Sequence, residues 1–145
     1  MKILQIIDGM SVGGAEKLMV TFTQESYRRG LPVTVLSLRP DVSPDFEHQI
    51  KTAGGDLVAF PKKRLLNLAR IRKVARFIKS GGYDIVQTHL TYANVVGPLA
   101  SRMVDVPAIG TLHLANLEND LRGRARQSIE TPSLRPAAAS VIAAW

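Results

Sequence analysis

The first sixteen residues constrain the fold more than any other part of the chain. Residues 2–7 form a short apolar run, which is typical of a buried strand. Asp8 and Gly9 end this run, and a loop of small residues with Gly13 and Gly14 leads into a helical pattern over residues 14–29. A strand, a glycine-rich turn and a helix N-terminus bring free backbone N–H groups and the positive end of a helix dipole together, which favours an anionic ligand. The alternative is a tight turn without a ligand, because glycine serves such turns at little steric cost.

The spacing of these glycines does not fit two well-known phosphate-binding motifs. Gly9, Gly13 and Gly14 do not form the G-x-G-x-x-G pattern of dinucleotide-binding proteins, and Arg39 follows the second predicted strand where an acidic residue is expected. The P-loop requires Lys and Ser or Thr after its last glycine, whereas residues 15–16 are Ala-Glu. An oxidoreductase that holds a phosphorylated dinucleotide through Arg39 is only a minor alternative, because the G-x-G-x-x-G fingerprint of such enzymes is missing.

Apolar patterns of two kinds alternate along the whole chain. Strands are predicted at residues 2–7, 33–38, 57–60, 84–88, 108–112 and 137–144, and helices at 14–29, 45–53, 65–79, 92–104 and 118–129. In the first helix we expect an inward side made of Ala15, Leu18, Met19, Phe22 and Ser26. Strands joined by crossover helices predict one Rossmann-like α/β domain over residues 1–145, a parallel sheet with helices on both faces. Ligands of such folds bind at the carboxyl ends of the strands.

The composition excludes several classes of protein and site. The chain has no cysteine, which excludes disulfides and thiolate metal sites, and its three histidines are dispersed. We therefore predict no metal and no cofactor. No apolar run approaches the length of a membrane span, and the N-terminal apolar run is too short for a signal peptide. These features predict a cytoplasmic protein.

The positive charge is concentrated in one segment. Residues 61–83 contain eight of the nineteen basic residues and no acidic one, and the remaining eleven basic residues are balanced by twelve acidic ones. On a helical projection, Leu68, Ile71, Val74, Ala75 and Ile78 share one side, and Arg72, Lys73, Arg76 and Lys79 share the other. The basic side predicts peripheral contact with an anionic membrane, and a solvated crossover helix is the alternative. Few exposed aromatic residues argue against binding to nucleic acid.

Several short motifs together resemble the N-terminal domain of family-4-like glycosyltransferases, which are retaining enzymes of the GT-B architecture. The motifs are Gly13-Gly14-Ala15-Glu16, residues 83–89 with the sequence Tyr-Asp-Ile-Val-Gln-Thr-His, Val106-Pro107 and Thr111-Leu112-His113. The resemblance implies an acceptor-side lobe, with the nucleotide-sugar donor held mainly by a C-terminal domain. The chain is too short to hold that domain, so we expect a fragment, a truncated gene product or one half of a split enzyme. This chain alone should therefore transfer little or no sugar.

The resemblance also implies roles for individual residues. Gly13 and Gly14 would approach the donor diphosphate and the acceptor, and Glu16 would contact the acceptor or simply favour the helix dipole. His113 would lie beside the transferred sugar as the catalytic histidine, and His89 would line the cleft or support the strand. A retaining mechanism assisted by the donor's own phosphate would need no protein nucleophile. The acceptor would be a glycan or a lipid-linked molecule. A stand-alone binding module, attached to an anionic membrane or to a partner through the basic helix, is the competing function.

Overall fold

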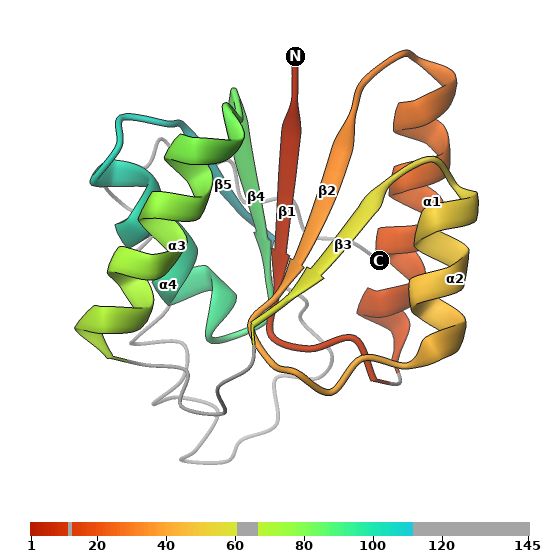
Figure 1. Ribbon diagram of the computed structural model, residues 1–145, viewed down its shortest axis with the longest axis horizontal. Coiled ribbons are helices and arrows are strands. Elements are labelled where there is room, and N and C mark those ends of the chain that lie inside the picture. Colours follow the sequence, from red (N-terminus) through yellow and green to blue (C-terminus); the bar gives the residue numbers. More distant parts are fainter. Residues whose placement is uncertain (12, 61–66, 112–145) are drawn as a thin grey trace.

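The computed structural model describes residues 1–11, 13–60 and 67–111, and these form a five-stranded parallel sheet with helices on both faces (Figure 1). The elements along the chain are β1 (Ile3–Ile7), α1 (Gly14–Arg28), β2 (Val33–Ser37), α2 (Pro44–Thr52), β3 (Asp56–Ala59), α3 (Leu68–Gly81), β4 (Ile85–His89), α4 (Ala93–Arg102) and β5 (Ala108–Thr111). The Rossmann-like fold predicted from the sequence is confirmed.

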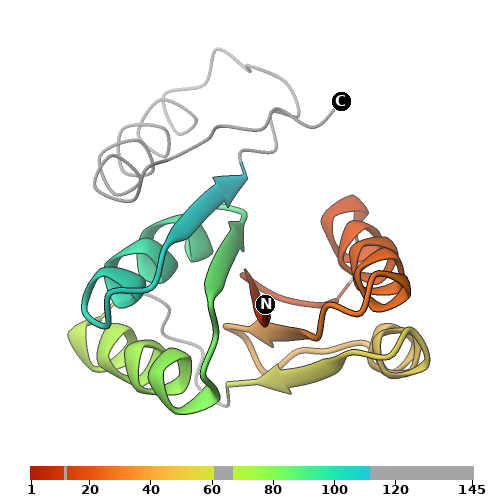
Figure 2. The ribbon, with the colours of Figure 1, turned by 90° about the horizontal axis from the view of Figure 1, so that it is seen from above.

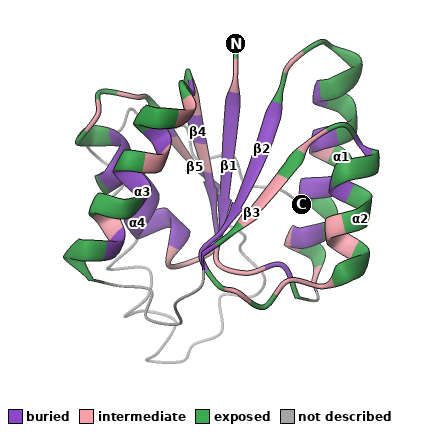
Figure 3. Ribbon diagram, in the orientation of Figure 1, coloured by how far each residue is buried: buried purple, intermediate pink, exposed green. Residues whose placement is uncertain are grey.

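The central strand β1 is buried along its whole length because both of its faces are covered. Its even-numbered residues Leu4 and Ile6 belong to a core beneath α3 and α4, and its odd-numbered residues Ile3 and Ile7 belong to a second core beneath α1 and α2. The two helix pairs lie on opposite sides of the sheet (Figure 2), and the inward face of each helix carries most of its buried residues (Figure 3). The continuous apolar run of β1 therefore follows from burial on both faces.

The strand order is β3-β2-β1-β4-β5. Strands are therefore added on one side of β1 up to β3 and on its other side from β4 onward, so the strand order reverses between β1 and β4. The segment from β1 to β3 builds one half of the sheet, and α3 then carries the chain across to β4 on the other side of β1. Ligands of open parallel sheets bind where the strand order reverses, at the carboxyl ends of the strands. We refer to that edge as the carboxyl rim.

The predicted elements that fall on described residues agree with the structure in type, and their bounds differ by one to three residues. The helix predicted from residue 65 begins at Leu68, because Asn67 is its N-cap and accepts a bond from the Arg70 N–H at 2.7 Å. It continues to Gly81, since the left-handed residue that ends it is Gly82. The helix predicted over residues 92–104 covers Ala93–Arg102. The helix predicted at 118–129 and the strand predicted at 137–144 lie outside the described residues.

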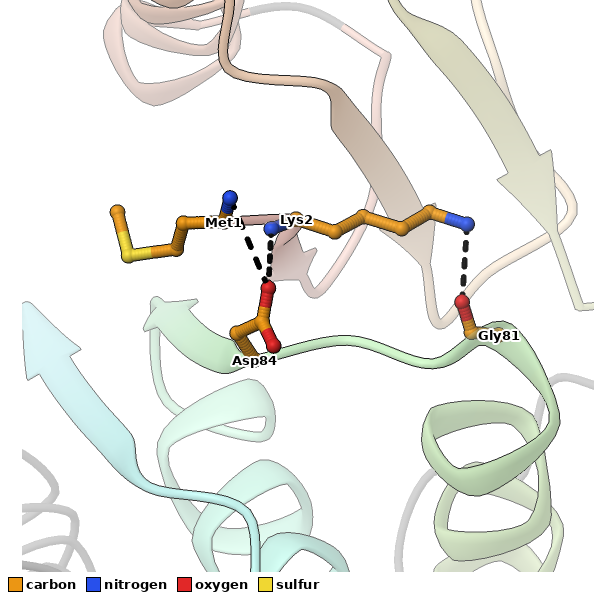
Figure 4. Close-up of polar contacts among 4 residues, drawn as sticks. All are labelled: Met1, Lys2, Gly81 and Asp84. Atoms are coloured by element: carbon orange, nitrogen blue, oxygen red, sulfur yellow. Dashed lines mark hydrogen bonds and ion pairs between the residues drawn. The ribbon is translucent and has the colours of Figure 1, made fainter.

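A set of contacts closes the edge of the sheet opposite the carboxyl rim (Figure 4). The backbone N–H of Lys2 donates to Oδ2 of Asp84 at 2.6 Å, and its Nζ donates to the carbonyl of Gly81 at 2.9 Å. The same ammonium group lies 4.8 Å from the centroid of the Tyr83 ring. Lys2 thus ties the start of β1 to the C-terminal end of α3, where a positive charge is favourable.

Candidate ligand site at the carboxyl rim

The loops that follow β1 and β2 run side by side at the carboxyl rim. Met10 and Val42 form an isolated parallel bridge beyond the strands, and the N–H of Ser43 donates to the carbonyl of Met10 at 2.7 Å. Met10 is fully buried, so it anchors the first part of the glycine-rich loop in the core. The loop that carries Gly13 and Gly14 therefore begins from a fixed point.

Gly13 and Gly14 lie at the start of α1 in different surroundings. Gly13 is the N-cap and has extended backbone dihedrals, and a Cβ built on it would collide with Oε2 of Glu16 and lie 3.2 Å from its Cδ. A Cβ on Gly14 would meet no atom within 4 Å. A larger residue at position 13 would require the Glu16 carboxylate to move, whereas position 14 faces open space.

Glu16 lies inside the first turn of α1 with 6% of its surface exposed. This differs from the inward side predicted for this helix. The buried residues are Glu16, Met19, Val20, Thr23 and Ser26, and the predicted core residue Leu18 is 37% exposed. The apolar pattern alone placed Leu18 on the inward side. It could not reveal that the carboxylate of Glu16 and the hydroxyl groups of Thr23 and Ser26 face inward instead. Thr23 satisfies its hydroxyl by donating to the Met19 carbonyl at 2.7 Å.

Asp8 closes the N-terminus of a different helix. Its Oδ1 accepts from the Ala93 N–H at 2.7 Å and its Oδ2 from the Tyr92 N–H at 3.2 Å. The side chain at the end of β1 therefore caps α4 across the point where the strand order reverses. Sequence reasoning took Asp8 only as the end of a strand, because the residues that it caps are more than eighty positions away.

His89 is buried at the end of β4 and belongs to a row of polar side chains across three strands. Its Nε2 lies 2.6 Å from Oε1 of Gln5, whose Nε2 donates to Oε1 of Gln87 at 3.0 Å. Gln87 in turn donates to Oγ1 of Thr111 at 3.0 Å. With Gln5 oriented in this way, His89 carries its proton on Nε2 and donates it. His89 is 1% exposed, which favours its support of the sheet over contact with a ligand.

Arg70 is a buried cation near the carboxyl rim that sequence reasoning did not single out. Its Nη2 donates to the carbonyl of Leu38, just beyond β2, at 3.1 Å, and its guanidinium lies 5.4 Å from the Phe60 ring centroid. Removal from water lowers the pKa of Arg70 from its usual value, and the group stays charged at neutral pH. Its position in the first turn of the basic helix, three residues after an Asn cap, was the available signal.

The predicted basic face of α3 is exposed as expected. Arg72, Lys73, Arg76 and Lys79 all lie on the outer side of the helix. The opposite side packs as predicted through Val74, Ala75 and Ile78, but Leu68, placed on that side by the projection, is 57% exposed. Leu68 is the first residue of α3. A hollow of about 570 Å³ runs beside this face and is lined by Phe60, Lys73, Arg76, Phe77, Lys79 and Ser80.

Two further predictions concern what the site holds. His113 lies outside the described residues, two positions after Thr111, the last residue of β5. Within residues 1–11, 13–60 and 67–111, no three His, Asp or Glu side chains are grouped so that they could bind a metal ion. None of the helices in this part of the chain is long and apolar enough to cross a membrane.

A family model matches almost the whole chain. The model for Glycosyltransferase Family 4 covers residues 12–144. The chain belongs to glycosyltransferase family 4. The match begins at the glycine-rich loop and includes β4, whose sequence carried part of the resemblance noted above. The family predicted from Gly13, Gly14 and the residues 83–89 motif is therefore confirmed. No curated protein matches the chain.

Solved structures with the same fold come from several bacteria. HepE of Anabaena, in complex with UDP, is 21% identical with a TM-score of 0.71, and the match covers 95% of this chain and 36% of HepE. A glycosyltransferase of Rickettsia africae is 18% identical with a TM-score of 0.64, covering 81% and 31%. The UDP-GlcNAc 2-epimerase of Neisseria meningitidis, bound to UDP-GlcNAc, is 14% identical with a TM-score of 0.61, covering 92% and 38%.

The similarity to these structures shows the fold of the chain. The share of each structure that the chain matches shows how much of a two-lobe enzyme it represents. The family 4 lobe spans about a third of the length of each of these three structures. It has the architecture of one lobe of a GT-B glycosyltransferase. Because an epimerase shares the fold, the assignment to the transferases depends on the family match and not on the topology.

Proposed function

We propose that this chain is the acceptor-side lobe of a retaining glycosyltransferase that uses a nucleotide-sugar donor. The observation that carries the proposal is the family 4 match over residues 12–144, which begins at a glycine-rich loop lying on the carboxyl rim. HepE, which is similar in fold, has been solved with UDP and with UDP-glucose, and this supports a nucleotide-sugar donor. The acceptor would be a glycan or a lipid-linked molecule, as in the family resemblance.

In this proposal the lobe positions the acceptor and a second lobe holds most of the donor. Gly13 and Gly14 bring the backbone of the α1 N-terminus close to the ligand, since the space beside Gly14 is open. His113 donates a hydrogen bond to a hydroxyl of the transferred sugar and stabilises charge that develops there. Attack occurs on the face that the leaving diphosphate occupies, and the diphosphate accepts the proton of the attacking hydroxyl. The configuration of the sugar is thereby retained without a protein nucleophile.

The test compares the 145-residue chain with the longest polypeptide encoded in its reading frame. Each is incubated with radiolabelled UDP-glucose, UDP-GlcNAc and GDP-mannose and with a membrane and glycan extract as the source of acceptor. We expect transfer by a polypeptide that contains both lobes and little or none by the 145-residue chain, because transfer requires donor and acceptor to be held together. The anomeric proton coupling of the product should report retention. A product of inverted configuration contradicts the mechanism, and efficient transfer by the 145-residue chain contradicts the division of labour.

A second function is favoured by the outer face of α3. Its four exposed cations would attract an anionic membrane by about 1 kcal/mol each, which suits a lobe that meets a lipid-linked acceptor. We propose that this face attaches the lobe peripherally to the cytoplasmic side of the membrane. The same face on a stand-alone lobe would make it a membrane-binding module without transferase activity.

The membrane proposal can be tested by sedimentation with vesicles that contain phosphatidylglycerol. Exchange of Lys73 and Arg76 for Glu should weaken binding by at least about thirtyfold, the equivalent of two lost cations. The matched control exchanges Lys51 and Arg102, two exposed basic residues on other helices, so that the net charge changes equally. Equal losses in both variants would show that net charge alone is responsible and would contradict a specific membrane face.

A further inference from the structure

The four cations on the outer face of α3 are not equivalent, because three of them line the hollow beside this helix. Lys73, Arg76 and Lys79 belong to its lining, and Arg72, which is also exposed, does not. The other described residues of the lining are Phe60, Phe77 and Ser80. The hollow measures about 570 Å³, within the range of about 300–1,000 Å³ that is typical of small-molecule sites. Attraction by charge alone requires no such hollow, so its lining indicates a more specific ligand.

The three cations of the lining lack an anionic partner in the described part of the chain. They recur every three residues, which makes them neighbours along one side of the helix, and like charges at that spacing repel one another. None of their side chains forms an ion pair or a hydrogen bond with a described residue, and the described lining contains no acidic residue. Lys73 lies against the wall of the hollow, with its Nζ 4.3 Å from the centroid of the Phe60 ring. An anionic group placed between these cations would replace their mutual repulsion by attraction.

The rest of the wall is aromatic and fixed to the core. The rings of Phe60 and Phe77 meet edge to face with centroids 5.8 Å apart, and Phe77 stacks on Tyr83 at 5.9 Å. Phe60 and Tyr83 belong to the core beneath α3, and Phe77 packs against it. A free phosphate would use the cations and leave the aromatic wall in contact with water. A molecule with an anionic head and an apolar chain would use both parts, because its chain also removes apolar surface from water.

We propose that the hollow is a binding site for one anionic phospholipid. The lipid phosphate lies at Arg76, between the two lysines of the row, because the planar guanidinium of an arginine matches a phosphate in a bidentate manner. The glycerol and the first acyl carbons lie against Phe77. The proposal rests on the membrane attachment proposed above and names its partner, a lipid of net negative charge that is held in a shaped site and not only attracted to a charged face.

The experiment is an NMR titration of the 145-residue chain with lipids whose acyl chains are short enough to stay dissolved as single molecules. Dihexanoylphosphatidylglycerol is the anionic lipid, dihexanoylphosphatidylcholine has no net charge, and glycerophosphate and inorganic phosphate are anions without acyl chains. A glutamate-rich peptide represents an acidic protein partner. We expect saturable one-to-one binding of the phosphatidylglycerol, with shifts of the amide signals of Phe77 and Ser80. Each of the other probes should bind at least about tenfold more weakly, because each lacks either the net charge or the acyl chain.

Two pairs of variants separate the hollow from the overall charge of the helix. Arg76→Gln removes a cation of the lining and should weaken phosphatidylglycerol binding about fivefold, the effect expected of one cation close to an anionic lipid. Arg72→Gln removes the same charge from the same helix outside the hollow, so it should change the affinity by less than about twofold. Ser80→Trp fills the hollow from an exposed position and keeps every charge, so it should abolish the saturable binding, whereas Ser80→Ala should not. Melting temperatures check that each variant is folded.

The inference would be overturned by equal losses in Arg72→Gln and Arg76→Gln, by saturable binding that survives in Ser80→Trp, or by any other probe binding as tightly as the phosphatidylglycerol. The absence of saturable phosphatidylglycerol binding would overturn it as well. The inference and the membrane attachment fail separately. Vesicle sedimentation that depends on Lys73 and Arg76, without saturable binding of the short-chain lipid, rejects only the lipid site. Saturable binding by a chain that does not sediment with phosphatidylglycerol vesicles rejects only the attachment.

Discussion

Two glycines inside helices should respond to the same substitution with opposite signs. Gly14 opens α1 and faces open space, whereas Gly97 lies in the middle of α4, where an added Cβ would collide with Cγ2 of Thr88 on β4. Replacement of a helical glycine by alanine contributes about 0.5–1 kcal/mol to stability, because alanine loses less backbone entropy on folding. At Gly14 nothing opposes this gain. At Gly97 the extra methyl group must displace a buried side chain of the neighbouring strand.

The magnitude at Gly97 follows from how well its surroundings are packed. Besides the collision with Cγ2, the added Cβ would lie 3.5 Å from Cβ of Thr88 and 3.5 Å from Cδ1 of Ile6, and both residues are fully buried. Overpacking of a core typically costs about 1–3 kcal/mol. After the gain in helix propensity, Gly97→Ala should destabilise the chain by about 0.5–2 kcal/mol, and Gly14→Ala should stabilise it by up to about 1 kcal/mol.

The assay is urea denaturation followed by circular dichroism, with comparison of midpoints at unchanged slope. A third variant identifies the colliding atom. Thr88→Ser removes Cγ2 and keeps the hydroxyl that donates to Oδ1 of Asn94 at 2.7 Å. In a double-mutant cycle, Gly97→Ala should cost less in the Thr88→Ser background. The reasoning would be refuted if Gly97→Ala stabilised the protein as Gly14→Ala does, or if the two changes at positions 88 and 97 were additive.

Three other predictions concern the Asp8 cap of α4, the pH dependence of the free energy of unfolding, and the role of His113 in sugar transfer. Asp8→Ala should destabilise the chain by about 1–2 kcal/mol in the same urea assay, since it leaves the start of α4 uncapped, and an unchanged midpoint would contradict the cap. Burial raises the pKa of Tyr83, so the folded state holds its proton longer than the unfolded state, and stability should fall as the pH rises above about 10. Tyr83→Phe should flatten that fall; an equally steep decline would contradict this assignment. In a polypeptide that transfers sugar, His113→Ala should lower the rate roughly a hundredfold while the exposed His48→Ala does not, and equal rates would remove His113 from the reaction.

Local patterns in the sequence were sufficient to predict the fold. The apolar run before Asp8, the helical periodicity of residues 68–79 and the glycines that end helices each depend on neighbours within a few residues, so they can be recognised without coordinates. The alternation of such elements then requires a parallel sheet. The glycine-rich loop was placed at the correct edge of the sheet for the same reason.

The parts of the rim that sequence reasoning missed depend on contacts between distant segments. Asp8 meets α4 and Gln5 meets His89 across more than eighty residues, and nothing near either residue indicates its partner. Glu16 was expected to contact the acceptor or to favour the helix dipole in a first turn, and neither role predicted its burial. Its burial depends on how α1 is rotated against the sheet, and an apolar periodicity that counted Leu18 as inward could not detect that rotation.

The acidic residues at the rim support the proposed division of labour between two lobes. The helices begin at the carboxyl rim, and three of the four described helices have a carboxylate at that end: Glu16 in α1, Asp45 and Glu47 in α2, and Asp8 bound to α4. Each of these groups offsets the positive end of a helix that could otherwise hold a phosphate. A rim built in this way offers hydrogen-bond acceptors to sugar hydroxyls, and it also carries the exposed Arg39 beside Gly9 and the buried Arg70. The carboxylates at three helix ends still favour a neutral acceptor here, and we expect the charge that holds the donor to come mainly from a second lobe, as proposed above.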